Sequence, residues 1–97
     1  MWCYTRPENL YGELRQKLGD FPLHRYWGPL ANIESTRWIV ESAIELAKAA
    51  RPNLFYIYLP HLDYAAQKDG PDSVAAGKAV LELDEVLGQL MNGLRDA

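Results

Sequence analysis

Apolar residues recur with the spacing of an α-helix in three parts of the chain. The spacing predicts helices over residues 8–18, 34–50 and 74–94, each with one apolar face and one polar face. The apolar faces consist of Leu10, Leu14 and Leu18 in the first helix, Ile39, Ala43, Leu46, Ala47 and Ala50 in the second, and Val80, Leu83, Leu87, Leu90, Met91 and Leu94 in the third. Gly19 is a C-terminal stop for the first helix, and Ser73 is an N-terminal cap for the third.

Residues 54–59, Leu-Phe-Tyr-Ile-Tyr-Leu, follow a different pattern, because they are apolar throughout and rich in residues that favour strands. A continuous apolar run of this length is typical of a strand covered on both faces, as in a parallel sheet between helices. Pro60 lacks a backbone N–H and therefore marks the end of the strand. We predict a buried strand over residues 54–59, with His61 and Asp63 just beyond its carboxyl end.

The order of these elements predicts the fold class. A helix, a short turn and a buried strand form half of a βαβ unit. We therefore expect an α/β fold, in which about three helices surround one central strand as a fragment of a doubly wound parallel-sheet domain. Residues 1–97 form one partial domain, with loops over residues 19–32 and 60–72. Ligands in open α/β sheets bind beyond the carboxyl ends of the strands, so a site is expected in the 60–72 loop.

Composition and charge exclude several kinds of partner. The 97 residues include ten Lys and Arg scattered among thirteen Asp and Glu, so the net charge is −3 and no basic stripe exists to bind nucleic acid. No apolar stretch approaches the ~20 residues of a membrane span, and the N-terminus has no hydrophobic signal region. The single cysteine, Cys3, cannot form an internal disulfide, which fits a reducing, cytoplasmic location.

The predicted loop over residues 19–32 carries three aromatic residues, Phe21, Tyr26 and Trp27. Their side chains either line a substrate pocket or pack the loop onto the core. Packing is favoured, because aromatic residues contribute strongly to core burial.

Beyond residue 54, the chain resembles a motif of the type I phosphodiesterase/nucleotide pyrophosphatase family, in the alkaline phosphatase superfamily. In that family an apolar strand leads into Asp-x-x-Gly-His, a short spacer, Gly-Pro-Asp-Ser and a long helix. Asp63 matches the Asp, which is a metal ligand in the family, and residues 70–73 match the Gly-Pro-Asp-Ser. Residues 83–90 resemble the helix that follows. Residues 26–29 and 33–50 resemble the linker and the helix that precede the strand in bacterial members.

The resemblance implies a metal-dependent hydrolase that cleaves phosphodiester or pyrophosphate bonds in small phosphoester molecules, with a divalent metal such as zinc. Asp63 would be one ligand of this metal. The family's second ligand, a His, is Gln67 here, and the Gly before it is Ala66. Either Gln67 or a water fills that position, or His61 does, since alternation along an extended segment would place His61 and Asp63 on the same side. A solvated His61 at the strand exit is an equally good interpretation.

The family's other functional groups have no counterpart in this chain: the early Asp, the nucleophilic Thr or Ser, the later Asp-His pair and the final His. No catalytic or substrate-binding residue is therefore assigned, and we expect the isolated chain to be inactive. The alternative is a non-catalytic α/β interaction or oligomerisation module that retains a relic of the metal loop. In both cases an unpaired strand over residues 54–59 favours self-association.

Overall fold

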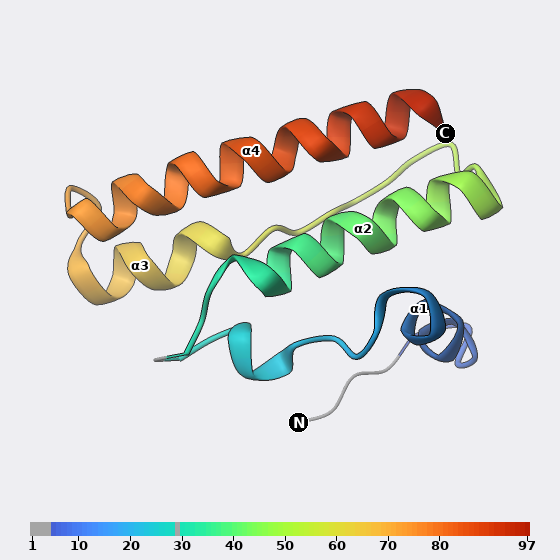
Figure 1. Ribbon diagram of the computed structural model, residues 1–97, viewed down its shortest axis with the longest axis horizontal. Coiled ribbons are helices and arrows are strands. Elements are labelled where there is room, and N and C mark those ends of the chain that lie inside the picture. Colours follow the sequence, from blue (N-terminus) through green and yellow to red (C-terminus); the bar gives the residue numbers. More distant parts are fainter. Residues whose placement is uncertain (1–4, 29) are drawn as a thin grey trace.

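The computed structural model describes residues 5–28 and 30–97, and it shows an arrangement of helices (Figure 1). Its elements, in chain order, are α1 (Leu10–Leu18), a short 3-10 helix η1 (Leu23–Arg25), α2 (Ile33–Ala50), α3 (His61–Asp69) and α4 (Val74–Asp96). α2 packs along α4, α3 packs against α4, and α1 packs against α2. None of the described helices has the length and apolar character needed to cross a lipid bilayer. Cys3 lies outside the described residues.

The predicted α/β fold is wrong for the described part of the chain, which contains four α-helices and neither a central strand nor a parallel sheet. Residues 54–59 run without helical structure between α2 and α4, as expected for an extended segment (Figure 1). However, no backbone hydrogen bond joins them to another described segment. A β-strand is stabilised by the ladder that it forms with a neighbour, and the described chain supplies no such neighbour. The apolar run therefore predicted a local conformation but not its pairing.

The predicted loop over residues 60–72 is wrong in its first part, which forms α3. Pro60 stands immediately before this helix, where its missing N–H breaks no helical hydrogen bond. Asp63 lies in the first turn, where a carboxylate is stabilised by the helix dipole. The family motif has Gly where this chain has Ala66, and Ala is the stronger helix former. α3 ends at Gly70, whose φ of 90° favours glycine.

The three helices predicted from periodicity are present and differ from the prediction only at their ends. Side-chain caps fix the starts of two of them. Asn32 Oδ1 accepts a hydrogen bond from the Glu34 N–H at 3.0 Å at the start of α2, and Ser73 Oγ accepts one from the Ala76 N–H at 3.1 Å at the start of α4. These caps satisfy N–H groups that have no partner within the helix.

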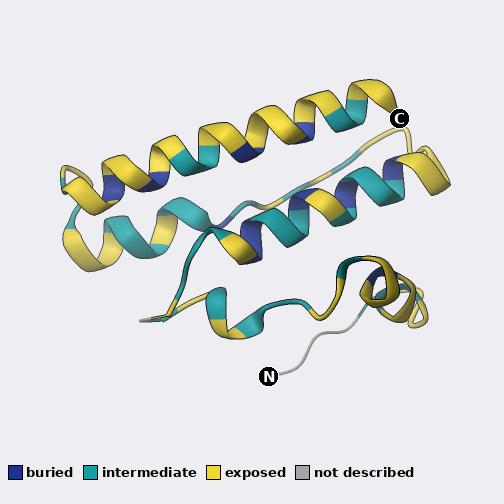
Figure 2. Ribbon diagram, viewed as in Figure 1, coloured by how far each residue is buried: buried dark blue, intermediate teal, exposed yellow. Residues whose placement is uncertain are grey.

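α2, α4 and the extended segment form the core (Figure 2). Four side chains at the contact between the two helices are buried: Val40, Ala43, Val86 and Leu90. Alternate side chains of the extended segment pack against them: Phe55, Ile57 and Leu59. The intervening side chains of the segment are exposed: Leu54, Tyr56 and Tyr58. The segment therefore has an inward face fixed by the core and an outward face open to solvent.

An aromatic cluster attaches α1 and the following loop to α2. Leu14 is the buried residue of α1. The Trp38 ring of α2 meets the Phe21 ring edge-on, with centroids 5.3 Å apart, and its Nε1 donates a hydrogen bond to the Gly19 carbonyl at 3.1 Å. The Tyr11 hydroxyl accepts a hydrogen bond from the Phe21 N–H at 3.0 Å. Of the two interpretations of the loop aromatics, packing therefore holds for Phe21.

Candidate functional site

Asp63 is exposed on the first turn of α3 and is held there by a neighbouring tyrosine. The Tyr58 hydroxyl donates a hydrogen bond to Asp63 Oδ2 at 2.5 Å, which joins α3 to the extended segment. This hydrogen bond raises the pKa of the Tyr58 phenol, because ionisation would remove the donor and place two negative charges together. Asp63 Oδ1 accepts no hydrogen bond from the described residues, so one carboxylate oxygen is fixed and the other is free.

His61 lies two residues before Asp63, but its side chain faces α4. His61 Nε2 is 3.2 Å from Glu82 Oε1, and the imidazole side chain is only 9% exposed. Each residue of an α-helix is rotated by about 100° from the one before it, so side chains two residues apart point to nearly opposite sides of the helix. The expectation that His61 and Asp63 share one side assumed an extended backbone, and it fails because both residues belong to α3. The interpretation of His61 as a solvated side chain at a strand exit is wrong as well, because its imidazole is only 9% exposed and contacts Glu82.

Gln67 shares a helix face with Asp63. It follows Asp63 by four residues on α3, and this spacing brings side chains together on the surface of a helix. Both residues are exposed. The structure therefore brings two of the three candidate ligands to one face, where a carboxylate and an amide oxygen are available, and separates His61 from them.

These residues fit part of a divalent-cation site. The Asp63 carboxylate and the Gln67 amide carbonyl are oxygen donors on one exposed helix face, and hard cations prefer such ligands. A closed zinc site usually takes four ligands. Among the described residues there is no group of three or more His, Cys, Asp or Glu side chains arranged to hold a metal. The other ligands of a complete site would therefore come from outside the described residues.

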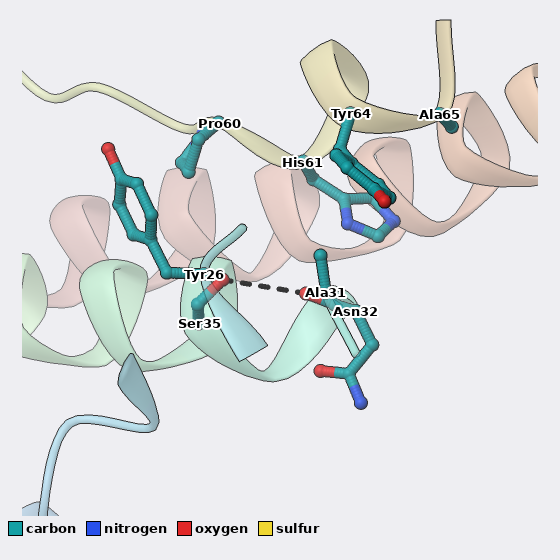
Figure 3. Close-up of a pocket in the computed structure, with 8 residues that line it drawn as sticks. All are labelled: Tyr26, Ala31, Asn32, Ser35, Pro60, His61, Tyr64 and Ala65. Carbon is teal, nitrogen blue, oxygen red and sulfur yellow. Dashed lines mark hydrogen bonds between the residues drawn. The ribbon is translucent and has the colours of Figure 1, made fainter. Parts of the chain in front are cut away.

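A small cavity lies beside His61, where the starts of α2 and α3 meet (Figure 3). Its volume is about 60 Å³, and it is lined by Tyr26, Ala31, Asn32, Ser35, Pro60, His61, Tyr64 and Ala65. This volume admits a few water molecules but not a nucleotide. Ser35 is 1% exposed, and its Oγ donates to the Asn32 carbonyl at 3.5 Å (Figure 3). The Ser35 hydroxyl therefore stabilises the start of α2, and it is too buried to be an accessible nucleophile.

Sequence reasoning missed this cavity. Ser35 and His61 are far apart in the chain, and only the packing of α2 beside α3 brings them to one cavity, so no local pattern marks the site. The two remaining loop aromatics lie next to it. Tyr26 lines the cavity, and the Trp27 ring meets the Tyr64 ring edge-on, with centroids 5.1 Å apart. Tyr26 therefore lines a cavity, but this cavity is too small for a nucleotide, so the interpretation as a substrate pocket stays a prediction.

Comparisons with known proteins agree on one family. A model of the type I phosphodiesterase / nucleotide pyrophosphatase family matches residues 2–97. The chain is similar to ectonucleotide pyrophosphatase/phosphodiesterase family member 3 of Rattus norvegicus, with 35% identity over 78 residues, which cover 79% of this chain and 9% of the rat protein.

Two further relatives come from other organisms. An uncharacterized pyrophosphatase/phosphodiesterase of Schizosaccharomyces pombe is 36% identical over 52 residues, which cover 54% of this chain and 11% of the yeast protein. A venom phosphodiesterase of Crotalus durissus collilineatus is 40% identical over 52 residues, which cover 54% of this chain and 6% of the venom protein. The chain thus spans between 6% and 11% of the length of these relatives. No solved structure matches it significantly.

Proposed function

Because the chain belongs to the type I phosphodiesterase/nucleotide pyrophosphatase family, we propose that it is a segment of a metal-dependent hydrolase of phosphodiester or pyrophosphate bonds. The observation that carries this proposal is the placement of Asp63. Asp63 lies four residues after the apolar segment, and the Gly-Pro-Asp-Ser of residues 70–73 and then α4 follow it in the order of the family motif. The substrate is a small phosphoester molecule.

Within the complete enzyme, Asp63 is one ligand of a divalent metal, with zinc as the first candidate. Support comes from its exposure, from the free Oδ1 and from the Gln67 amide on the same helix face. A bound metal of this kind supplies positive charge that stabilises the phosphoryl oxygens. Gln67 is a weaker zinc ligand than the imidazole that the family has at this position, so it lowers the affinity of the site for zinc.

The isolated chain is inactive in this proposal. It carries one carboxylate ligand, and none of its hydroxyl residues matches the family's nucleophile. The transition state of phosphoryl transfer needs preorganised positive charge around the phosphoryl oxygens, which one carboxylate and one amide cannot provide. The purified chain, supplied with zinc or manganese, is expected to hydrolyse a nitrophenyl phosphodiester no faster than the metal alone. Metal-stimulated hydrolysis that disappears in Asp63→Ala would overturn this expectation.

A chimaera tests whether Asp63 acts as a metal ligand in a complete enzyme. In the rat relative, the 78 matched residues are replaced by the corresponding residues of this chain. Metal-dependent hydrolysis is expected in the chimaera, and Asp63→Ala should remove most of it. A Leu81→Ala chimaera is the control, because Leu81 is an exposed residue of α4 and lies outside the motif of residues 63–73. A folded chimaera that loses no activity with Asp63→Ala contradicts the proposal.

A further inference from the structure

We propose that Tyr58 is a positioning residue for Asp63: its hydroxyl holds Oδ2 of the carboxylate so that Oδ1 is presented to a divalent cation. This inference rests on the proposed function, in which Asp63 is a metal ligand. It assigns a role to Tyr58, which lies in the apolar run before the Asp-x-x-Gly-His match and for which the resemblance implied no role.

The first support is the geometry of the contact. The Tyr58 hydroxyl lies 2.5 Å from Asp63 Oδ2, which is the short distance typical of a hydroxyl that donates to an ionised carboxylate. Both side chains are exposed, and Tyr58 is 60% exposed. Water would satisfy an exposed carboxylate equally well, so this bond contributes little to stability and chiefly fixes the orientation of the Asp63 side chain.

The second support is how firmly Tyr58 itself is held. Its neighbours Ile57 and Leu59 point inward and pack against the core between α2 and α4. Alternation along the extended segment therefore points Tyr58 outward, toward the start of α3. A partner mounted on a packed segment is what orients a metal ligand effectively, because outer groups that are themselves fixed reduce the freedom of the ligand.

The segment also supplies a matched control. Tyr56 is the preceding outward residue on the same segment and is 92% exposed. Its hydroxyl makes no hydrogen bond to the described residues. Tyr56→Phe and Tyr58→Phe therefore remove the same atom from the same segment, but only Tyr58→Phe removes a contact to Asp63.

The test is a calorimetric zinc titration of the 97-residue chain in a Gln67→His background. Gln67→His places an imidazole one helical turn from Asp63, which raises zinc affinity enough to measure differences. Tyr58→Phe is expected to weaken zinc binding about tenfold, the size found when outer partners of metal ligands are removed. Tyr56→Phe should leave zinc affinity unchanged. Circular dichroism at each titration temperature establishes that all variants are equally folded.

The outcomes separate the two proposals. Equal zinc affinity in the Tyr58→Phe and Tyr56→Phe variants overturns the positioning role, and so does a Tyr58→Phe variant that is less stable but binds zinc as tightly as its parent. Zinc affinity that falls with Asp63→Ala but not with Tyr58→Phe leaves the proposed function standing without the positioning role. Zinc affinity unaffected by Asp63→Ala overturns both.

Discussion

Thr36 carries a hydroxyl that the fold buries without a partner. The residue lies in the first turns of α2 and is 0% exposed, and its Oγ1 makes no hydrogen bond within the described residues. Its neighbour Ser35 is buried to the same degree, but the Ser35 hydroxyl donates to the Asn32 carbonyl. An unpaired buried hydroxyl costs roughly 1–3 kcal/mol of stability.

Thr36→Val should therefore stabilise the chain. Valine has the same shape and is also β-branched, so packing and helix propensity change little while the unpaired hydroxyl is removed. We expect the free energy of unfolding in urea to rise by about 1 kcal/mol. Ser35→Ala is the control and should not raise it, since that hydroxyl has a partner. A decrease in stability with Thr36→Val would show that Thr36 Oγ1 has an acceptor in solution.

For individual residues of the candidate site, the sequence predicted only part of what the structure shows. Asp63 became a candidate because it follows the apolar segment and because it matches the metal-ligand Asp of the family motif. Its partner Tyr58 and the partner of His61, Glu82, depend on how α3 sits against the extended segment and α4. These contacts join separate elements, so neither composition nor spacing predicts them.

Among the elements, the three long helical patterns were predictable because helix period is a local property of the sequence. α3 was missed because the family motif suggested a loop there, whereas Ala66 and its neighbours favour a helix in this chain. Residues 54–59 were predicted to be a strand because their side chains favour extended backbone. Pairing in a sheet depends on a second segment, and no local pattern in residues 54–59 specifies one.

The contact between α2 and α4 depends on a glycine. A Cβ added at Gly93 would meet the Ile44 side chain, with its Cγ1 at 2.6 Å and its Cδ1 closer still. Gly88 lies on the same helix, and a Cβ there would meet no atom within 4 Å. Alanine substitutions at the two glycines therefore distinguish the effect of packing against α2 from the effect of helix propensity.

Gly93→Ala is expected to lower the free energy of unfolding in urea by about 1–2 kcal/mol, because overpacking outweighs the gain in helix propensity. Gly88→Ala should raise it by up to about 1 kcal/mol, since only the propensity term applies. If both substitutions stabilise the chain by similar amounts, α2 and α4 do not approach as closely as the structure indicates.

For the whole molecule, the outward face of residues 54–59 leads us to propose self-association. Leu54, Tyr56 and Tyr58 are between 60% and 92% exposed, and the backbone between them is unpaired within the described chain. Exposed apolar side chains beside free backbone donors and acceptors favour contact with another chain. Light scattering should therefore show a mass that rises with concentration.

Tyr56→Lys should reduce this association, because a charge on the outward face opposes pairing. Leu81→Lys adds the same charge at an exposed apolar site of α4 and should leave association intact. A strict monomer at high concentration, or association that Leu81→Lys weakens as much as Tyr56→Lys, would contradict the proposal.

We propose that Asp63 is a metal-ligand carboxylate of a phosphoester hydrolase, and zinc calorimetry on two variants tests this proposal most directly. Gln67→His restores an imidazole one helical turn from Asp63, and Gln67→His with Asp63→Ala removes the carboxylate again. We predict that zinc binds the first variant at least about tenfold more tightly than the second, a difference of ~1.4 kcal/mol. Equal zinc affinity in the two variants would contradict the claim.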